Sequence, residues 1–241
     1  MRPTQRFAVA ALAGVLALGA APAAREPRGK PAPDPAAAAV LARFDAARRG
    51  IRSFEAEVTE TRSMALLSKA EVLRGTLTFQ VPGRVRWAYR EPEERVYVLA
   101  DGQLTGWIPS RNRVEKVNVA RREDRIRSLI AFGNEAQDLQ REFQVSLVQP
   151  SSVAGADELL LVPDSRRLRR RVPEIRLWVD QRSGLLRQVR WLTGDGDRVQ
   201  LELTNFRANP PLPADTFTLK IPPGAEVVEG VSSLGLFGES T

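Results

Sequence analysis

The side chains best placed for a function in this sequence are apolar ones that alternate with arginines. In residues 81–102, VPGRVRWAYREPEERVYVLADG, the residues Val85, Trp87 and Tyr89 fall at every second position, and arginines fill most of the places around them. Successive side chains of a strand point to opposite faces, so this stretch predicts one apolar face and one charged face. An apolar face takes up hydrocarbon without directed hydrogen bonds.

The composition excludes most catalytic chemistry. The chain of 241 residues contains no His and no Cys, which removes Ser-His-Asp and Cys-His nucleophiles and His or Cys ligands for zinc or copper. The sequence has no glycine-rich phosphate loop and no nucleophile elbow. A hydrolase that uses two carboxylates is the remaining option, but no acidic pair predicts it. We therefore expect no enzyme, no catalytic residue, no metal site and no cofactor.

The first residues have the pattern of an export signal. Arg2 and Arg6 precede an uncharged apolar run that ends in Ala21-Pro22-Ala23, which predicts a secretory signal peptide over residues 1–23. The run is shorter than the roughly 20 residues that a membrane helix needs, although an uncleaved anchor is the alternative. Residues 24–35 are Pro-rich and are expected to be a flexible leader. We expect an exported, soluble protein.

One helix is predicted before a long series of strands. Asp34 is suited to cap this helix, and Gly50 ends it. From Ser53 the apolar period changes from that of a helix to that of a strand. About eleven or twelve short strands follow, and two short helices interrupt them between residues 126 and 141.

The short connections define the fold class, because they pair strands that follow each other in sequence. Asp101-Gly102 predicts a two-residue hairpin turn, and the last strand is expected at residues 217–221. The prediction is a mainly β domain over residues 36–230, followed by a flexible tail at 231–241. It consists of a single curved antiparallel sheet, an open and incomplete β-barrel of about eleven strands, with a short α-helical lid over its concave apolar face.

The apolar residues of these elements are the candidates for the wall of a cavity and for its lid. The predicted cavity wall consists of Leu77, Phe79, Trp87, Tyr89, Val98, Leu177, Val189 and Trp191. The predicted lid residues are Val40, Leu41, Phe44, Ile126, Leu129, Ile130 and Phe132. The alternative is that these side chains fill an ordinary packed core, because a lid helix and a core helix look the same in sequence.

A strongly basic run lies between two predicted strands at residues 165–172, SRRLRRRV. A solvated loop is one interpretation, and a docking surface for an acidic partner or for anionic head groups is the other. Nucleic acid is not an expected partner, because no aromatic residues lie among these arginines. The docking candidates are Arg166, Arg167, Arg169, Arg170 and Arg171.

The order of motifs along the chain points to a family. Residues 75–87 follow the pattern G-x-L-x-h-x-x-P-x-x-h-x-W, where h is apolar, and a hairpin with Pro92 and Asp101-Gly102 comes next. Residues 175–205 follow with a strand, an Asp-x-x-x-Gly turn and two further strands, and residues 217–230 end in a Pro-x-Gly turn. This order resembles the LolA family of periplasmic lipoprotein carriers over most of residues 36–230.

The resemblance implies a cargo and partners. The cargo would be acylated lipoproteins, whose acyl chains are shielded in the cavity between the inner and the outer membrane. An inner-membrane ABC transporter would supply it, an outer-membrane receptor lipoprotein would accept it, and the carrier would be a monomer. The alternative on the same fold is a carrier or sensor of another envelope lipid, such as a glycolipid. One position departs from the family, since Val81 replaces a basic residue that is implied to bond the lid.

Overall fold

The computed structural model describes residues 34–65, 69–119 and 136–229. The predicted signal peptide, most of the predicted leader, the predicted helix around residues 126–132 and the tail at 231–241 lie outside the described residues.

The first described element is the helix α1, Pro35–Arg48. The Asp34 side chain accepts hydrogen bonds from the backbone N–H groups of Ala36 and Ala37. These bonds satisfy two of the donors that a helix start leaves without partners. The predicted cap at Asp34 is therefore confirmed.

Twelve strands follow α1 and form one sheet. They are β1 (Ser53–Ser63), β2 (Glu71–Gln80), β3 (Arg84–Glu91), β4 (Arg95–Ala100), β5 (Gln103–Ile108), β6 (Arg113–Asn118), β7 (Phe143–Val148), β8 (Ala156–Pro163), β9 (Ile175–Asp180), β10 (Leu186–Leu192), β11 (Arg198–Ala208) and β12 (Glu226–Glu229). The described helices besides α1 are α3 (Ala136–Glu142) and α4 (Arg166–Arg171), and Pro109–Arg111 form a 3-10 turn.

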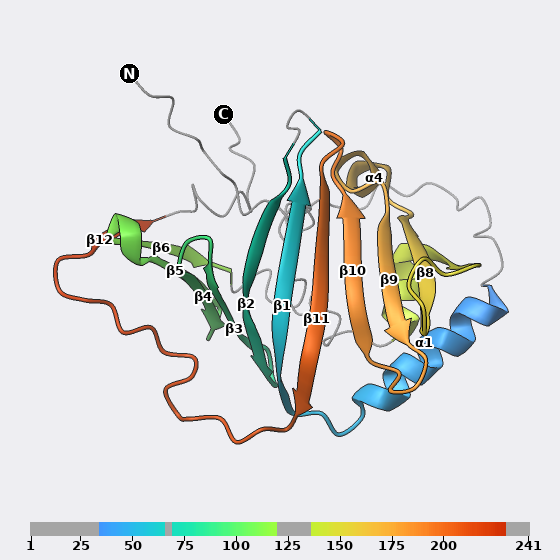
Figure 1. Cartoon of the computed structure of the whole chain (residues 1–241), viewed down its shortest axis with the longest axis horizontal. Helices are drawn as coiled ribbons and strands as arrows, with labels where there is room; N and C mark the ends of the chain where they lie inside the picture. The colour runs from blue at the N-terminus through green and yellow to red at the C-terminus, as the bar shows by residue number, and fades with distance from the viewer. Residues whose placement is uncertain (1–33, 66–68, 120–135, 230–241) are drawn as a thin grey trace, which may run out of the picture.

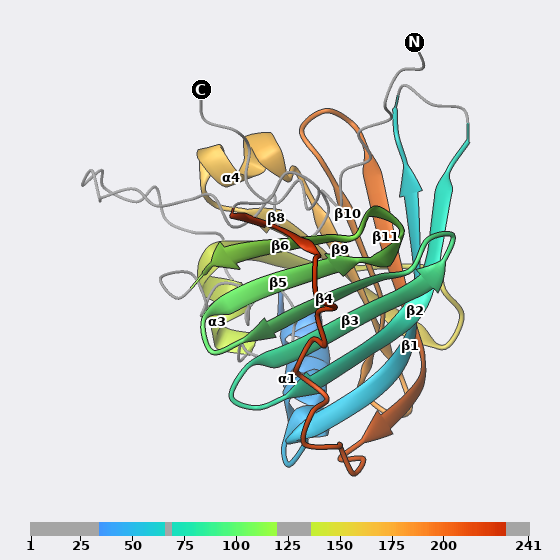
Figure 2. The same ribbon diagram turned by 90° about the vertical axis from the view of Figure 1, so that its left-hand side faces the viewer.

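The sheet is a meander that curves strongly and stays open. Its order is β12-β6-β5-β4-β3-β2-β1-β11-β10-β9-β8-β7. The strands β1 and β11 join two halves that are each built from sequential hairpins, apart from β12. Figure 1 shows the two halves bending away from β1 and β11, and Figure 2 shows α1 and α3 within the curve. The mainly β class and the open curved sheet are as predicted.

The end of the chain departs from the prediction. Residues 217–221, where the sequence predicts a strand, form none. The segment 209–225 instead runs across the outer face of the first half of the sheet (Figure 2), and its prolines lack the N–H that a sheet ladder needs. The chain rejoins the sheet only at β12, which pairs parallel with β6. The sheet is therefore not purely antiparallel, because the long segment returns the chain to the edge in the parallel sense.

The predicted hairpin turn is present. Asp101 and Gly102 connect β4 directly to β5, and both have positive φ, 50° and 73°. A two-residue turn of this kind needs two positive φ values, which Asp and Gly tolerate best. The turn fixes the register in which Leu99 lies opposite Leu104.

The core lies on the concave face of the sheet. Phe54, Leu77, Trp87 and Leu177 belong to one buried cluster that also contains the apolar side of α1. The apolar face predicted at residues 84–90 faces this core, because Val85, Trp87 and Tyr89 point into the cluster. Most of the intervening side chains point outward.

Candidate functional site

The predicted cavity wall on β2 and β3 forms one continuous surface. Cross-strand pairing places Leu77 opposite Trp87, and Tyr89 opposite Gly75. Leu77, Phe79, Trp87 and Tyr89 are all buried in the main cluster. Gly75 allows the close approach of β2 and β3, because a Cβ there would lie 2.1 Å from the backbone oxygen of Ala88.

The predicted wall residues of the second half lie on the same face. Leu177 pairs with Val189, and Trp191 pairs with Ile175. Leu177 and Trp191 are buried in the main cluster, and Val189 packs against it as a half-buried side chain. Pairing with β11 continues this face through Val199 and Leu201.

Val98 is the one wall candidate that the structure places on the other face. It pairs with Arg86 and Thr105, whereas Tyr97 pairs with Trp87. The outer face at this place is overlain by the segment 209–225, where the carbonyl of Thr216 accepts a hydrogen bond from Arg86. Val98 is therefore only 4% exposed although it faces away from the main cluster.

The apolar pattern of β4 does not reveal which of its side chains face the wall, because residues 96–99 are all apolar and both faces of the strand are covered. Tyr97 and Leu99 consequently belong to the concave wall, although the sequence pattern does not predict it. The length of the turn at residues 92–94 fixes the register of β4 against β3, and so it decides which β4 residue lies opposite Trp87. This turn length is therefore the sequence feature that could have identified Tyr97 and Leu99 as wall residues.

One end of the concave wall carries buried charges. Glu60 and Arg62 follow the apolar residues of β1 on the same face, and they form an ion pair with each other. The Tyr89 hydroxyl donates to the Glu60 carboxylate, and Arg62 also lies 3.8 Å from a Glu71 oxygen. Burial, followed by the charge of Glu60, raises the pKa of Tyr89 well above its ordinary value.

The lid candidates of α1 are packed into the concave cluster. Val40, Leu41 and Phe44 are buried there. The helix is tied to the second half of the sheet, because Asp34 accepts from the backbone N–H of Leu147 on β7 and Arg43 pairs with Asp157 on β8. The other lid candidates, Ile126, Leu129, Ile130 and Phe132, lie outside the described residues.

The position that departs from the family lies in the turn between β2 and β3. Val81 follows β2, is 37% exposed, and donates its backbone N–H to the carbonyl of Arg52. Arg84 and Arg86 point to the outer face, where Arg84 lies 3.5 Å from Asp101. Neither arginine therefore reaches the concave wall in place of a basic residue at position 81.

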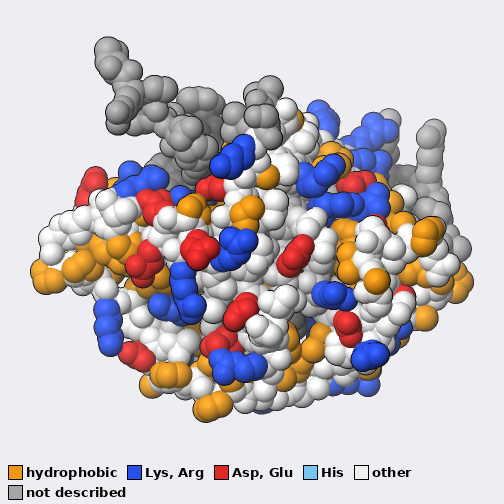
Figure 3. Space-filling view, in the orientation of Figure 1, with side chains coloured by type: hydrophobic (Ala, Val, Ile, Leu, Met, Phe, Trp, Pro, Cys, Tyr) orange, Lys and Arg blue, Asp and Glu red, His pale blue; other side chains and the backbone are white. Residues whose placement is uncertain are grey.

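The basic run at residues 166–171 forms the short helix α4 rather than a loop. Ser165 caps it, and Leu168 anchors it as its buried residue. Arg169 is used structurally, since its guanidinium donates two hydrogen bonds to the Pro163 carbonyl. The other arginines of α4 are exposed, and Figure 3 shows Lys and Arg side chains gathered at the upper right, where Figure 1 places this helix.

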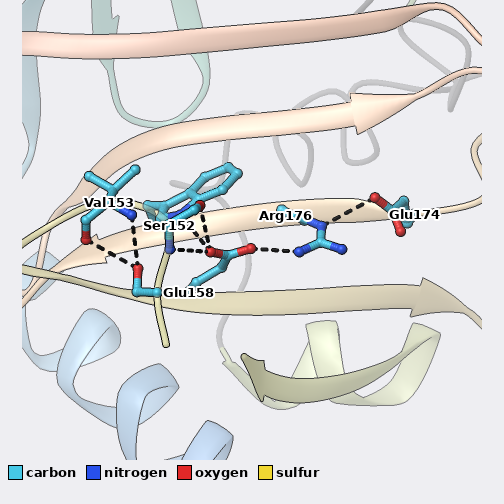
Figure 4. A network of polar contacts seen from close by, with 7 residues as sticks. Ser152, Val153, Glu158, Glu174 and Arg176 are labelled. Atoms are coloured by element: carbon cyan, nitrogen blue, oxygen red, sulfur yellow. Dashed lines mark hydrogen bonds and ion pairs between the residues drawn. The ribbon is translucent and has the colours of Figure 1, made fainter. Parts of the chain in front are cut away.

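A saturated polar network lies on the outer face of the second half (Figure 4). Glu158 accepts from the backbone N–H and the hydroxyl of Ser152, from Arg176 and from the indole N–H of Trp178. Burial would raise the pKa of Glu158, but the bonds from Ser152, Arg176 and Trp178 outweigh it and lower this pKa to about 2. We call these four residues the Glu158 network, and its role is to hold the β7–β8 hairpin against β9.

In the described ranges, no group of three or more acidic side chains is arranged to hold a metal ion. The described helices include none that is long and apolar enough to cross a membrane. The side chains that the fold brings together are thus apolar and aromatic, with charges at one end of the wall.

The open curved sheet, whose concave face gathers apolar and aromatic side chains, is the feature to compare with known proteins. The family model described as "Outer membrane lipoprotein carrier protein LolA" matches residues 49–220. Since this is most of the chain, the protein belongs to the LolA family.

Individual curated relatives agree with this assignment, and a solved structure shares the fold. An outer-membrane lipoprotein carrier protein of Cupriavidus taiwanensis is 27% identical over 199 residues, which are 81% of this chain and 90% of that protein. One from Bordetella avium is 30% identical over 156 residues, 64% of this chain and 70% of that protein. An uncharacterized conserved protein from Thermus thermophilus has a similar fold, with a TM-score of 0.52 at 12% identity, over 81% of this chain and 99% of that one.

Proposed function

We propose that this protein is a periplasmic carrier that shields the acyl chains of lipoproteins on its concave face and moves them from the inner to the outer membrane. The observation that carries the proposal is the continuous apolar surface formed by strands from both halves of one open sheet. Membership of the LolA family and the names of the curated relatives support it. The signal peptide at residues 1–23 would export the chain, and residues 36–230 would form the carrier domain.

The energetics of lipid transfer suit such a surface. Hydrocarbon burial is worth about 0.8 kcal/mol per CH₂ group, so an acylated protein needs a matching apolar surface to cross water. Leu77, Phe79, Trp87 and Tyr89, together with Leu177, Val189 and Trp191, would supply it. Because the hydrophobic effect is not directional, one wall can accept different lipoproteins.

The lid would consist of α1 and the segment that carries Ile126, Leu129, Ile130 and Phe132. The bonds of α1 to β7 and β8 would keep it on the second half of the sheet, so that the first half can open. Control of the lid would differ from that of relatives with a basic residue at the position of Val81.

Docking would involve α4. Its exposed arginines Arg166, Arg167, Arg170 and Arg171 would steer the carrier to acidic surfaces of an inner-membrane ABC transporter or an outer-membrane receptor lipoprotein, whereas Arg169 is held by Pro163. The carrier would act as a monomer. Reversing these four charges should slow association most at low ionic strength, and Arg182→Glu on a distant exposed turn is the matched control.

The experiment that tests the proposal is mass spectrometry of what co-purifies with the mature protein from the periplasm of its own host. Lipidated N-terminal peptides or whole lipoproteins would support the carrier. Free lipid without peptide would favour the alternative, a carrier or sensor of another envelope lipid. A protein that carries nothing would contradict both and leave the concave residues as ordinary core.

A further inference from the structure

Two polar atoms of the concave wall lack hydrogen-bond partners among the described residues. Trp87 on β3 and Tyr97 on β4 face each other directly as a cross-strand pair. They are 9% and 6% exposed. Within the part of the chain that the structure describes, neither the Nε1–H of Trp87 nor the hydroxyl of Tyr97 has a partner. Buried polar atoms of this kind are rare in native proteins, because each loses its bonds to water without replacement.

Their neighbours show that the fold can satisfy such atoms where it needs to. The hydroxyl of Tyr89, on the same wall, donates to Glu60. Its ring centroid is 5.8 Å from that of Trp87 and 6.5 Å from that of Tyr97. The missing partners of Trp87 and Tyr97 are therefore a feature of this pair and not of the whole wall.

Both atoms of the pair are hydrogen-bond donors at neutral pH. An indole N–H can only donate. Burial raises the pKa of Tyr97 to about 12, against the lowering effect of Arg95, so the phenol keeps its proton. The two donors come from directly paired residues of one wall, and an acceptor with two lone pairs, such as a carbonyl oxygen, is the kind of group that both lack.

The surroundings fit a carbonyl that is attached to a hydrocarbon chain. The row of paired residues across the sheet runs from Gly106 through Tyr97 and Trp87 to Leu77 and Ala56. On the side of Leu77 the wall is apolar. On the side of Tyr97 the next strand has Gly106, which leaves room for the Tyr97 ring to lie over it, since a Cβ there would lie 3.0 Å from that ring.

We propose that Trp87 and Tyr97 form a binding site for an acyl carbonyl, the ester or amide oxygen that joins a fatty acyl chain to its head group. The proposal rests on the function proposed above and adds an orientation to it. The chain lies toward Leu77 and Ala56, and the head group lies toward β5. The other wall residues hold hydrocarbon in any register, whereas this pair fixes where the chain begins.

The test compares two probes that differ only in the carbonyl. One is a synthetic peptide with an N-terminal cysteine that carries two ester-linked palmitoyl chains on its glyceryl group, and the other is its dialkyl ether analogue. Binding is measured for the full mature protein and for Trp87→Phe, Tyr97→Phe and the double variant. Each replacement removes a donor and keeps an aromatic ring.

We expect the native protein to prefer the ester probe, and the double variant to bind that probe on the order of tenfold more weakly while it binds the ether as before. Trp178→Phe is the matched control, because it deletes an indole N–H on the outer face that is already bonded to Ser152 and Glu158; it should leave the ester preference intact. Urea unfolding of each variant confirms that it is folded.

An unchanged ester preference in the double variant, or no preference in the native protein, would overturn the carbonyl site while leaving the carrier function standing. A native protein that binds neither probe would contradict the proposed function itself.

Discussion

Trp178 and Trp87 are both buried in the same sheet, on opposite faces and in opposite halves. Their indole N–H groups differ in hydrogen bonding. The N–H of Trp178 lies 3.1 Å from both the Ser152 hydroxyl and a Glu158 oxygen. The N–H of Trp87 has no partner within the described residues. The Glu158 network is thus closed on itself, whereas the Trp87–Tyr97 pair has bonding capacity left over.

The difference teaches how to separate a structural polar cluster from a candidate binding site in a protein without catalytic groups. A closed cluster serves the fold and should affect stability when it is changed. A pair with unused donors contributes nothing to the fold through them and should affect ligand binding when it is changed. The two regions therefore predict opposite responses to similar substitutions.

The largest effect on stability is expected from the closed region. Glu158→Ala should lower the free energy of unfolding by about 3–5 kcal/mol, because it leaves Arg176, Trp178 and Ser152 without their shared acceptor. Urea unfolding at pH 7 measures it. Glu202→Ala, an exposed change on the same face, should stay within about 0.5 kcal/mol. A loss at Glu158 no larger than that of Glu202 would mean that the network does not hold this half of the sheet.

The second-largest effect is expected from acid, which should weaken the Glu158 network. The pKa of Glu158 in the folded protein is lowered from 4.5 to about 2. Its stabilising effect is therefore fully present above about pH 4.5 and is lost as the pH falls toward 2, by on the order of 3 kcal/mol. The urea midpoints of the native protein and of the Glu158→Gln variant are measured at pH 5 and at pH 2.5, and the difference between them should be smaller at pH 2.5. A difference that does not decrease would contradict the lowered pKa.

Tyr89 and Tyr97 of the wall should differ less in how much stability the loss of their hydroxyl costs. Tyr89→Phe should cost about 1.5–3 kcal/mol, because it removes a donor from the buried Glu60 carboxylate. Tyr97→Phe removes a hydroxyl without a described partner, and it should cost less than about 0.5 kcal/mol. Thermal or urea unfolding of both variants decides this. Equal losses would show that the Tyr97 hydroxyl is bonded in the folded protein.

The smallest contrast is between the tryptophans. Trp178→Phe and Trp87→Phe remove the same atoms from two buried sites, so their losses of packing are similar. The difference between them isolates the N–H, and Trp178→Phe should be more destabilising by about 1 kcal/mol. Urea unfolding of the two variants side by side checks it. A more destabilised Trp87→Phe would reverse the comparison.

Sequence reasoning succeeds where a feature depends on near neighbours. The cap at Asp34, the turn at Asp101-Gly102 and the alternation of Val85, Trp87 and Tyr89 are each decided within a few residues. All the predicted wall residues except Val98 lie on one face for the same reason, because each strand that carries them alternates clearly enough to fix its own phase.

The sequence could not decide which residues far apart in the chain come into contact. The prediction that Val98 lies on the wall is wrong because a strand covered on both faces has no alternation to interpret. The partner of Tyr89 is Glu60, from β1, and the partner of Arg176 is Glu158, from β8. The sequence by itself determined which side chains a strand turns to each face. Only the tertiary structure decided which buried polar atoms find partners, because a hydrogen bond depends on the position of both ends and the second end comes from elsewhere in the chain.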